Sequence, residues 1–236
     1  MKTSILIPTF NYGRFIGAAI DSVLAQQADD FEIIVIDRQS ADGTAEVLRS
    51  YTDLPNFHVV QQRGRGLANA CNEGLAVASG RYILRLDADD LFCPGIMLIE
   101  SLILDYNEEL DFVYGDYFAL VDDTGERIRK RLPAFDAVEL MARGDFLCGG
   151  TMYRRGVFER FGGYDESLET LISYDFILRL MKGDARGYHV PVPLFAYRLH
   201  GASMSTESER IERTGRLIAE RHGQAYTWNE HHPRTF

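Results

Sequence analysis

Only three of the 236 residues are cysteines, and this small number limits the chemistry of the chain. Cys71, Cys93 and Cys148 lie far apart and form no Cys-x-x-Cys pair. An odd, scattered set of cysteines does not build a disulfide framework, and it does not match the ligand spacing of a zinc site. The cysteine content therefore predicts a protein of a reducing compartment.

Long apolar runs and positive charge are also scarce. No uninterrupted apolar run approaches the roughly 20 residues that cross a bilayer, and the run at residues 5–8 is too short for a signal peptide. A formal net charge of −10 argues against the basic surface that nucleic-acid binding requires. We expect a soluble cytoplasmic protein that binds no nucleic acid, and peripheral contact with the inner face of the membrane stays open.

Two signatures of nucleotide enzymes are missing as well. No Gly-x-Gly-x-x-Gly follows a predicted strand, which disfavours a nicotinamide-dependent enzyme. Residues 8–11 read Pro-Thr-Phe-Asn, whereas a nucleotidyltransferase would carry a loop rich in glycine and lysine at this point. The chain also lacks repeats and linkers rich in proline and serine, so we expect one domain.

The first half of the chain alternates short apolar runs with helical patterns. Such alternation predicts βαβ units and a mostly parallel sheet over about the first 110 residues. The carboxyl ends of parallel strands share one edge, where open α/β sheets bind ligands. The predicted strands are 4–7, 31–36, 57–60 and 82–86, and the predicted helices are 14–26, 44–51 and 67–78.

The second half has a less regular pattern. A strand at 112–120 runs into a hairpin-like turn at 122–125, and a helix is predicted at 174–181. A late strand at 194–199 precedes a charged amphipathic helix at 207–222. We therefore expect strands and helices in mixed order beyond residue 110.

The predicted strand at 82–86 leads into the acidic stretch Asp87-Ala88-Asp89-Asp90. Carboxylates this close repel one another, and a hard divalent cation such as Mg²⁺ or Mn²⁺ relieves the repulsion. The alternative is a solvated acidic turn before the helix that begins near Pro94. Because short acidic motifs also occur by chance, the stretch alone leaves both interpretations open.

Further motifs appear in a fixed order along almost the whole chain. With these motifs in place, the sequence resembles a family 2 glycosyltransferase of the GT-A type. The motifs are Ile5–Asn11, Ile36-Asp37 with Ser40 and Asp42-Gly43-Thr44, Asn72-Glu73-Gly74, Asp87–Asp90 (the Asp-x-Asp motif), Phe161–Glu166 and Tyr197–His200.

The resemblance implies an α/β fold of the GT-A class, which is a Rossmann-like α/β/α sandwich with a mostly parallel sheet. Residues 1–236 would form a single domain, with a nucleotide-sugar-binding half at 1–110 and a mixed acceptor-binding half with a C-terminal helix at 111–236.

The resemblance also implies an inverting, metal-dependent glycosyltransferase. It would move a hexosyl or related sugar from a nucleotide-sugar donor, a UDP-sugar on family grounds, to a hydroxyl of a saccharide or lipid-linked saccharide. Such transfer serves the synthesis of cell-surface polysaccharide, lipopolysaccharide or other glycoconjugates. The alternative is a catalytically silent nucleotide-sugar-binding module of the same fold.

Carried over position by position, the resemblance implies a donor site with a divalent metal, Mn²⁺ or Mg²⁺. Asp89 and His200 would bind the metal. The chemistry of the nucleotide contacts is consistent, since a carboxylate accepts hydrogen bonds from the N–H groups of a base and an aromatic side chain stacks on it. The implied donor-binding residues are Pro8, Thr9, Tyr12, Asp37, Asp87, Ala88 and Arg198.

Two positions of the implied donor site depart from the family pattern. Arg38 stands where a second acidic residue often follows Asp37, which leaves the identity of the base open. Cys71 stands where the family often carries a basic residue on the following helix. These departures motivate the alternative of a silent binding module.

The third departure concerns the general base. Family members usually place an acidic residue six positions before the arginine equivalent to Arg179, and Ser173 occupies that place here. An un-ionised serine is a poor base, and an acceptor hydroxyl needs a carboxylate within hydrogen-bonding reach. Our hypothesis is that Asp175 or Glu169 is the base; for Asp175 the alternative is charge stabilisation at a helix N-terminus.

Overall fold

In this computed structural model, residues 2–138, 149–201, 203 and 207–224 are described. Cys148 lies outside these ranges. The described residues form one mixed sheet in the order β3-β2-β1-β4-β8-β6-β9-β5, with β7 paired to β6. Its strands are β1 (Thr3–Thr9), β2 (Phe31–Asp37), β3 (Phe57–Gln61), β4 (Tyr82–Arg85), β5 (Leu91–Phe92), β6 (Phe112–Val121), β7 (Arg127–Lys130), β8 (Thr151–Arg154) and β9 (Gly187–Leu199).

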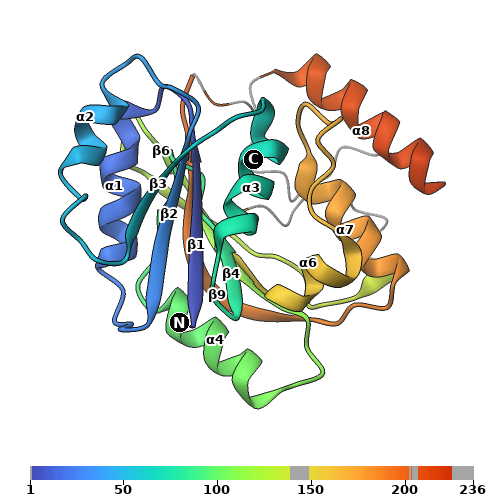
Figure 1. The fold of residues 1–236 in the computed structure, drawn as a ribbon. Coiled ribbons are helices and arrows are strands. Elements are labelled where there is room, and N and C mark those ends of the chain that lie inside the picture. The colour runs from blue at the N-terminus through green and yellow to red at the C-terminus, as the bar shows by residue number, and fades with distance from the viewer. Residues whose placement is uncertain (1, 139–148, 202, 204–206, 225–236) are drawn as a thin grey trace.

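Helices cover both faces of the parallel part of this sheet. Because the chain moves outward from β1 to β3 and then returns to β4, right-handed crossovers place the first two helices on one face and the third on the other. Figure 1 shows this arrangement, with the strands between α1 and α2 on one side and α3 on the other. The described helices are α1 (Gly13–Leu24), α2 (Thr44–Arg49), α3 (Gly66–Val77), α4 (Ile96–Tyr106), α6 (Arg155–Phe161), α7 (Ile172–Lys182) and α8 (Ser208–His222).

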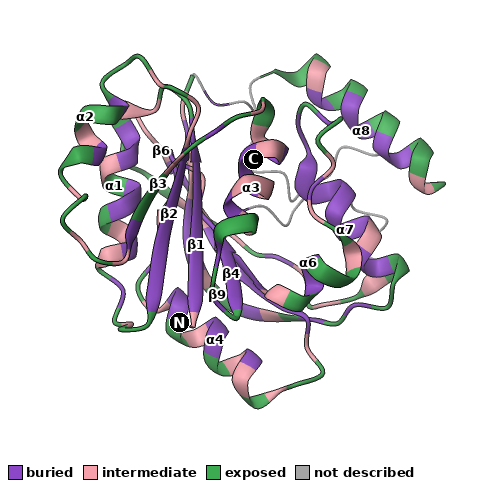
Figure 2. Cartoon of the chain, viewed as in Figure 1, coloured by how far each residue is buried: buried purple, intermediate pink, exposed green. Residues whose placement is uncertain are grey.

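The continuous apolar runs of the first half form strands that are buried on both sides. All seven residues of β1 are buried, and so are the first six of β2. β1 pairs in parallel with β2 and β4, and β2 pairs in parallel with β3. Figure 2 shows the buried residues concentrated in these central strands and on the helix faces turned towards them. The prediction of an α/β fold is confirmed, with a sheet that is parallel in the first half and mixed beyond it.

The late strand is longer than the predicted 194–199, because β9 begins at Gly187. Pro191 and Pro193 interrupt the apolar pattern and hide the earlier part of the strand. The structure accommodates them through a register shift, since Gly115 of β6 pairs with Val190 while Asp116 pairs with Pro193. A proline removes a ladder hydrogen bond, and a bulge is one of the places where a sheet tolerates it.

The two halves of the chain are joined by the side chain of Asn72 on α3. Its Nδ2 donates to the carbonyl oxygen of Tyr164 at 2.9 Å, and its Oδ1 accepts from the Tyr164 N–H at 2.8 Å. A Cβ atom at Gly163 would collide with Asn72 Oδ1, so the close approach requires glycine. Arg179 of α7 holds the same loop by donating to the carbonyl of Gly163 at 2.7 Å. The motifs around residues 72 and 161–166 thus serve packing between the halves.

No helix in the described ranges has the length and apolar character of a membrane span. The limits of the predicted single domain stay a prediction.

Glu100 of α4 is an unusual component of the core. Its side chain is fully buried, and neither carboxyl oxygen has a hydrogen-bond partner among the described residues. Burial raises the pKa of this carboxyl well above its usual value, because the charged form is disfavoured away from water. Between the pKa of Glu100 in the unfolded chain and its higher pKa in the fold, the folded protein therefore keeps a proton on this carboxyl that the unfolded chain releases.

We predict that Glu100→Gln raises stability at pH 8 by about 1 kcal/mol or more and has little effect near pH 4. A carboxyl with a raised pKa stabilises the fold fully below its unfolded pKa and loses that contribution as the pH rises. The amide has the same shape and does not ionise. Urea unfolding at the two pH values measures the difference. Glu109→Gln, at an exposed residue just after α4, is the control. An equal gain at both pH values would contradict the role of ionisation.

Candidate functional site

Four strands deliver predicted donor-site residues to one edge of the sheet. β1 ends at Thr9, β2 ends at Asp37, Asp87 follows β4 closely, and His200 follows β9. β4 and β6 both run antiparallel to β8, and β9 runs parallel to β6, so β9 has the direction of β1 and β4. The carboxyl ends therefore meet at the edge where open α/β sheets bind ligands.

The acidic stretch after β4 is partly buried, with Asp87 and Asp89 half-buried and Asp90 buried. Asp90 is 1% exposed, and its Oδ1 accepts a hydrogen bond from the Arg198 N–H at 2.8 Å. Its Oδ2 is buried and has no hydrogen-bond partner in the described part of the chain. Burial, followed by the charges of Asp89 and Asp87, raises the pKa of Asp90 well above its usual value. At Asp90 the stretch is therefore not a solvated turn.

Asp89 and His200 come from distant parts of the chain and meet directly. Asp89 Oδ2 lies 2.9 Å from His200 Nε2, and both side chains are largely buried. The imidazole ring lies against the ring of Phe15 with 4.5 Å between centroids, and Tyr12 approaches its edge at 6.2 Å. These contacts fix the direction in which the imidazole nitrogen points.

This pair has the ligand types that a divalent metal uses in a phosphate site. Carboxylate and imidazole both bind Mn²⁺, and metals in phosphate sites take one or two protein carboxylates and complete their shell with phosphate oxygens and water. Within the described ranges, no group of three or more His, Cys, Asp or Glu side chains is arranged to hold a metal ion. The unpartnered Asp90 Oδ2 in the same cluster is consistent with a cation that binds together with a phosphate ligand.

Arg198 connects the acidic stretch to the rim of the site. Its Nε donates to the carbonyl oxygen of Asp89 at 2.7 Å, and its Nη1 pairs with Asp122 Oδ1 at 2.9 Å. Asp122 in turn pairs with Arg14 at 2.7 Å. The guanidinium also lies over the ring of Phe15, with 5.3 Å to the centroid. Arg198 is thus held at this edge of the sheet by carboxylate and aromatic contacts, and its role in donor binding stays a prediction.

The loops after β1 and β2 are interlocked around Asp37. Ser40 donates its hydroxyl to Asp37 Oδ1 at 2.6 Å and receives a hydrogen bond from the Asn11 N–H at 2.8 Å. Asn11 and Gln39 have φ values of 58° and 54°, a backbone conformation that residues other than glycine adopt rarely. Strained backbone of this kind clusters at ligand sites, where the surrounding contacts maintain it.

The other predicted donor contacts differ in how they could act. Tyr12 lies near His200, with 6.2 Å between the ring centroids. Burial, followed by the charges of Asp89, Asp87 and Asp90, raises the pKa of its hydroxyl. Thr9 Oγ1 is buried without a hydrogen-bond partner among the described residues.

Pro8 and Ala88 are buried in the sheet and in the acidic stretch. The two side chains have little surface to offer, so contact with a nucleotide would run through their backbone.

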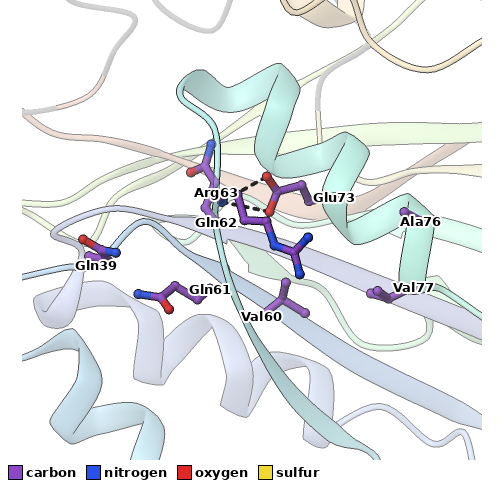
Figure 3. A pocket seen from close by; sticks show the side chains of 8 residues that line it. All are labelled: Gln39, Val60, Gln61, Gln62, Arg63, Glu73, Ala76 and Val77. Carbon is purple, nitrogen blue, oxygen red and sulfur yellow. Dashed lines mark hydrogen bonds between the residues drawn. The ribbon is translucent and has the colours of Figure 1, made fainter.

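A groove of about 600 Å³ lies beside Asp37, between the edge strand β3 and α3. Glu73 accepts hydrogen bonds from the backbone N–H groups of Arg63 at 3.0 Å and Gly64 at 3.1 Å, and this fixes the glycine-rich loop (Figure 3). Arg38 does not enter this groove's lining; its guanidinium lies over the ring of Phe10, 4.7 Å from the centroid. The lining residues are Gln39, Val60, Gln61, Gln62, Arg63, Glu73, Ala76 and Val77.

The two candidate bases are both engaged by cationic or imidazole side chains. Asp175 is 4% exposed; its Oδ2 pairs with Arg179 Nε and its Oδ1 with His222 Nε2, each at 2.9 Å. Glu169 is more exposed and pairs with Arg213 of α8 at 3.0 Å. Their role as a base stays a prediction.

Sequence reasoning missed Arg85, which stands in the buried strand β4. Its Nη1 donates to Ser173 Oγ at 3.2 Å, and its Nε lies 3.1 Å from Asp87 Oδ1. Burial raises the pKa of the neighbouring Cys71 thiol to about 12, so this thiol is uncharged at neutral pH. The sequence did contain a signal for Arg85. It is a charged residue in an apolar strand, two positions before Asp87, and residues two apart in a strand point to the same face of the sheet.

Comparison with known proteins identifies the family. The family model "Glycosyl transferase family 2" matches residues 4–162. The chain belongs to glycosyltransferase family 2. This glycosyltransferase is 30% identical over 195 residues to a PGL/p-HBAD biosynthesis glycosyltransferase of Mycobacterium bovis. The match covers 80% of this chain and 74% of the relative. It is 29% identical over 203 residues to the putative glycosyltransferase EpsE of Bacillus subtilis, which covers 84% of this chain and 73% of that relative.

Solved structures confirm the predicted GT-A fold. Residues 1–349 of TarS from S. aureus, in complex with UDP-GlcNAc, match with a TM-score of 0.78 and 19% identity over 99% of this chain and 69% of that one. The mannosyltransferase PcManGT from Pyrobaculum calidifontis, in complex with GDP-Man and Mn²⁺, matches with a TM-score of 0.73 and 16% identity over 99% and 67%.

We predict that His222→Ala lowers the stability of this glycosyltransferase by about 1–3 kcal/mol. The substitution leaves Asp175 Oδ1 buried without its partner and removes a contact between α7 and α8. Thermal unfolding measures the loss, and Arg216→Ala, an exposed residue of the same helix, is the control. A midpoint equal to that of the wild type would show that the Asp175–His222 contact does not hold α8 in place.

Proposed function

We propose that this protein is an inverting, metal-dependent glycosyltransferase with a nucleotide-sugar donor. The observation that carries the proposal is the meeting of Asp89 and His200 at 2.9 Å, at the ligand-binding edge of the sheet. The Asp-x-Asp motif supplies one of these ligands and the end of β9 supplies the other. Neighbouring structures of the same fold bind UDP-GlcNAc, UDP or GDP-Man with Mn²⁺, which supports a donor of this class.

Each residue of the donor site has a role that its chemistry suits. Asp37 would accept hydrogen bonds from the N–H groups of the base, and Tyr12 would stack on it. Asp89 and His200 would hold Mn²⁺ or Mg²⁺ beside the diphosphate, and Arg198 would add a positive charge. A bound divalent cation offsets the negative charge of the departing nucleoside diphosphate.

We propose a hydroxyl of a saccharide or lipid-linked saccharide as the acceptor, in the synthesis of cell-surface polysaccharide, lipopolysaccharide or another glycoconjugate. The name of the mycobacterial relative, which refers to PGL/p-HBAD biosynthesis, is consistent with a glycoconjugate product. A UDP-sugar is the proposed donor. We place the protein in the cytoplasm, where a lipid-linked acceptor would bring it to the inner face of the membrane.

A silent donor-binding module is the second candidate, and one observation favours it. Ser173, at the position where the family usually carries its catalytic carboxylate, accepts a hydrogen bond from Arg85. Such a module would bind the donor without turnover. Hydrolysis or transfer of the donor in the presence of Mn²⁺ separates the enzyme from the module.

The metal-dependent donor site predicts a specific pattern of ligand-induced stabilisation. UDP, GDP, dTDP and CMP are each added with Mn²⁺, Mg²⁺ or EDTA, and the melting temperature is recorded. One nucleotide should raise it in the presence of metal, because a ligand that binds only the folded state stabilises it. Asp89→Asn should remove most of that increase, while the exposed control Asp123→Asn should keep it. A wild-type protein that no nucleotide–metal pair stabilises would rule out the proposed donor site.

The proposed base is tested by turnover. We expect Asp175→Asn or Glu169→Gln to lower kcat by about 100-fold or more, since general base catalysis contributes about this much. His222→Ala breaks the contact between His222 and Asp175 Oδ1 but keeps the carboxylate. It therefore controls for misplacement of α7. If both carboxylate variants turn over at the wild-type rate, neither residue is the base.

A further inference from the structure

The guanidinium of Arg85 bridges two parts of the proposed enzyme. It approaches both oxygens of Asp87, with Nε–Oδ1 at 3.1 Å and Nη2–Oδ2 at 3.3 Å. Its Nη1 donates to the Ser173 hydroxyl at 3.2 Å. Asp87 belongs to the Asp-x-Asp motif, and Ser173 stands in the first turn of α7. A single side chain thus connects the acidic stretch to the acceptor half.

Burial of the Arg85 charge costs free energy that a residue with only a packing role would not need to spend. Its side chain is 8% exposed and lies in a strand whose four residues are all buried. Removing a guanidinium from water costs several kcal/mol, and apolar side chains of similar volume often fill such places without loss of stability. The nearby Cys71 and Tyr164 are buried and carry no charge at neutral pH. The ion pair with Asp87 gives this buried cation an opposite charge inside the protein.

The planar guanidinium of arginine can contact two oxygens of one carboxylate, whereas the ammonium of a lysine acts as a point charge. Arg85 Nη2 donates a hydrogen bond to Asp87 Oδ2, while Nε lies 3.1 Å from Oδ1 as an ion-pair contact without hydrogen-bond geometry. Contacts to both oxygens limit the rotation of the carboxylate as well as its distance. The charge of Asp89 disfavours ionised Asp87, and the Arg85 cation acts against that repulsion. Ser173 occupies a third N–H of the same group and limits its rotation.

We propose that Arg85 is a positioning residue for donor binding: it fixes the Asp87 carboxylate in the orientation that meets the donor, and Ser173 fixes Arg85. The proposal rests on the proposed function, because it needs a donor at the Asp-x-Asp motif. It gives Ser173 a role that does not require a base. It also makes the first turn of α7 part of the support of the donor site.

The test compares Arg85→Met, Arg85→Lys, Ser173→Ala and the double variant Arg85→Met/Ser173→Ala with the wild type. Titration calorimetry measures the dissociation constant of the nucleoside diphosphate that stabilises the wild type most, with Mn²⁺ present. Thermal unfolding without ligand measures the stability of each variant. Arg81→Met is the matched control, because Arg81 directly precedes β4, is largely exposed and pairs with Asp105.

We expect Arg85→Met to weaken nucleotide binding about tenfold or more, as loss of charge-assisted hydrogen bonds does. Arg85→Lys and Ser173→Ala should each weaken it less, and Arg81→Met should bind as the wild type does. The double variant should bind no more weakly than Arg85→Met alone, since both changes break one chain of contacts. In kinetics, KM for the donor should rise more than kcat falls.

Wild-type affinity in both Arg85→Lys and Ser173→Ala would overturn the proposal, and these two variants decide the matter where Arg85→Met does not fold. Additive losses in the double variant would overturn the link through Ser173. A wild-type protein that binds no nucleotide would overturn the proposed function, and the role of Arg85 with it. The two failures are therefore distinguishable by the wild-type titration.

Discussion

Repulsion among clustered, partly buried carboxylates is the constraint around which the site is arranged. Asp87, Asp89 and Asp90 occupy four consecutive positions with Ala88, at the end of a buried strand. Each carboxylate is met by a different residue: Arg85 of β4 meets Asp87, His200 after β9 meets Asp89, and the backbone N–H of Arg198 in β9 meets Asp90. The partners neutralise part of the charge and leave one oxygen of Asp90 unpartnered among the described residues. Such a cluster favours a cation that arrives with its own anionic ligand.

The second half of the chain supplies what this cluster requires. β9 carries Arg198 and His200 to the acidic stretch because β8 and β6 extend the sheet and restore the direction of β4. Asn72 holds the 161–166 loop by its backbone, and Ser173 reaches Arg85 from α7. The edge of the sheet that carries the acidic stretch is thus completed by contacts between residues that are about 90 to 110 positions apart in the sequence.

The sequence predicted the local features of this structure well. The four apolar runs became β1 to β4, and the placement of Asp37 and Asp87 at one edge followed from their strand ends. The extent of β9 could not be predicted, because Pro191 and Pro193 fit only through the register shift against Gly115. Long-range contacts such as Arg85–Ser173 and Asp175–His222 depend on how α7 and α8 pack, which no local pattern encodes.

The central claim is that Asp89 and His200 together bind the metal that accompanies the donor. Crystals grown with Mn²⁺ and a nucleoside diphosphate test it directly, through anomalous difference density measured at the manganese edge. We expect one strong peak within bonding distance of Asp89 Oδ2 and His200 Nε2, at about 2.0–2.3 Å, with phosphate oxygens in its shell. A peak bound elsewhere, or nucleotide density without a metal at this pair, would contradict it.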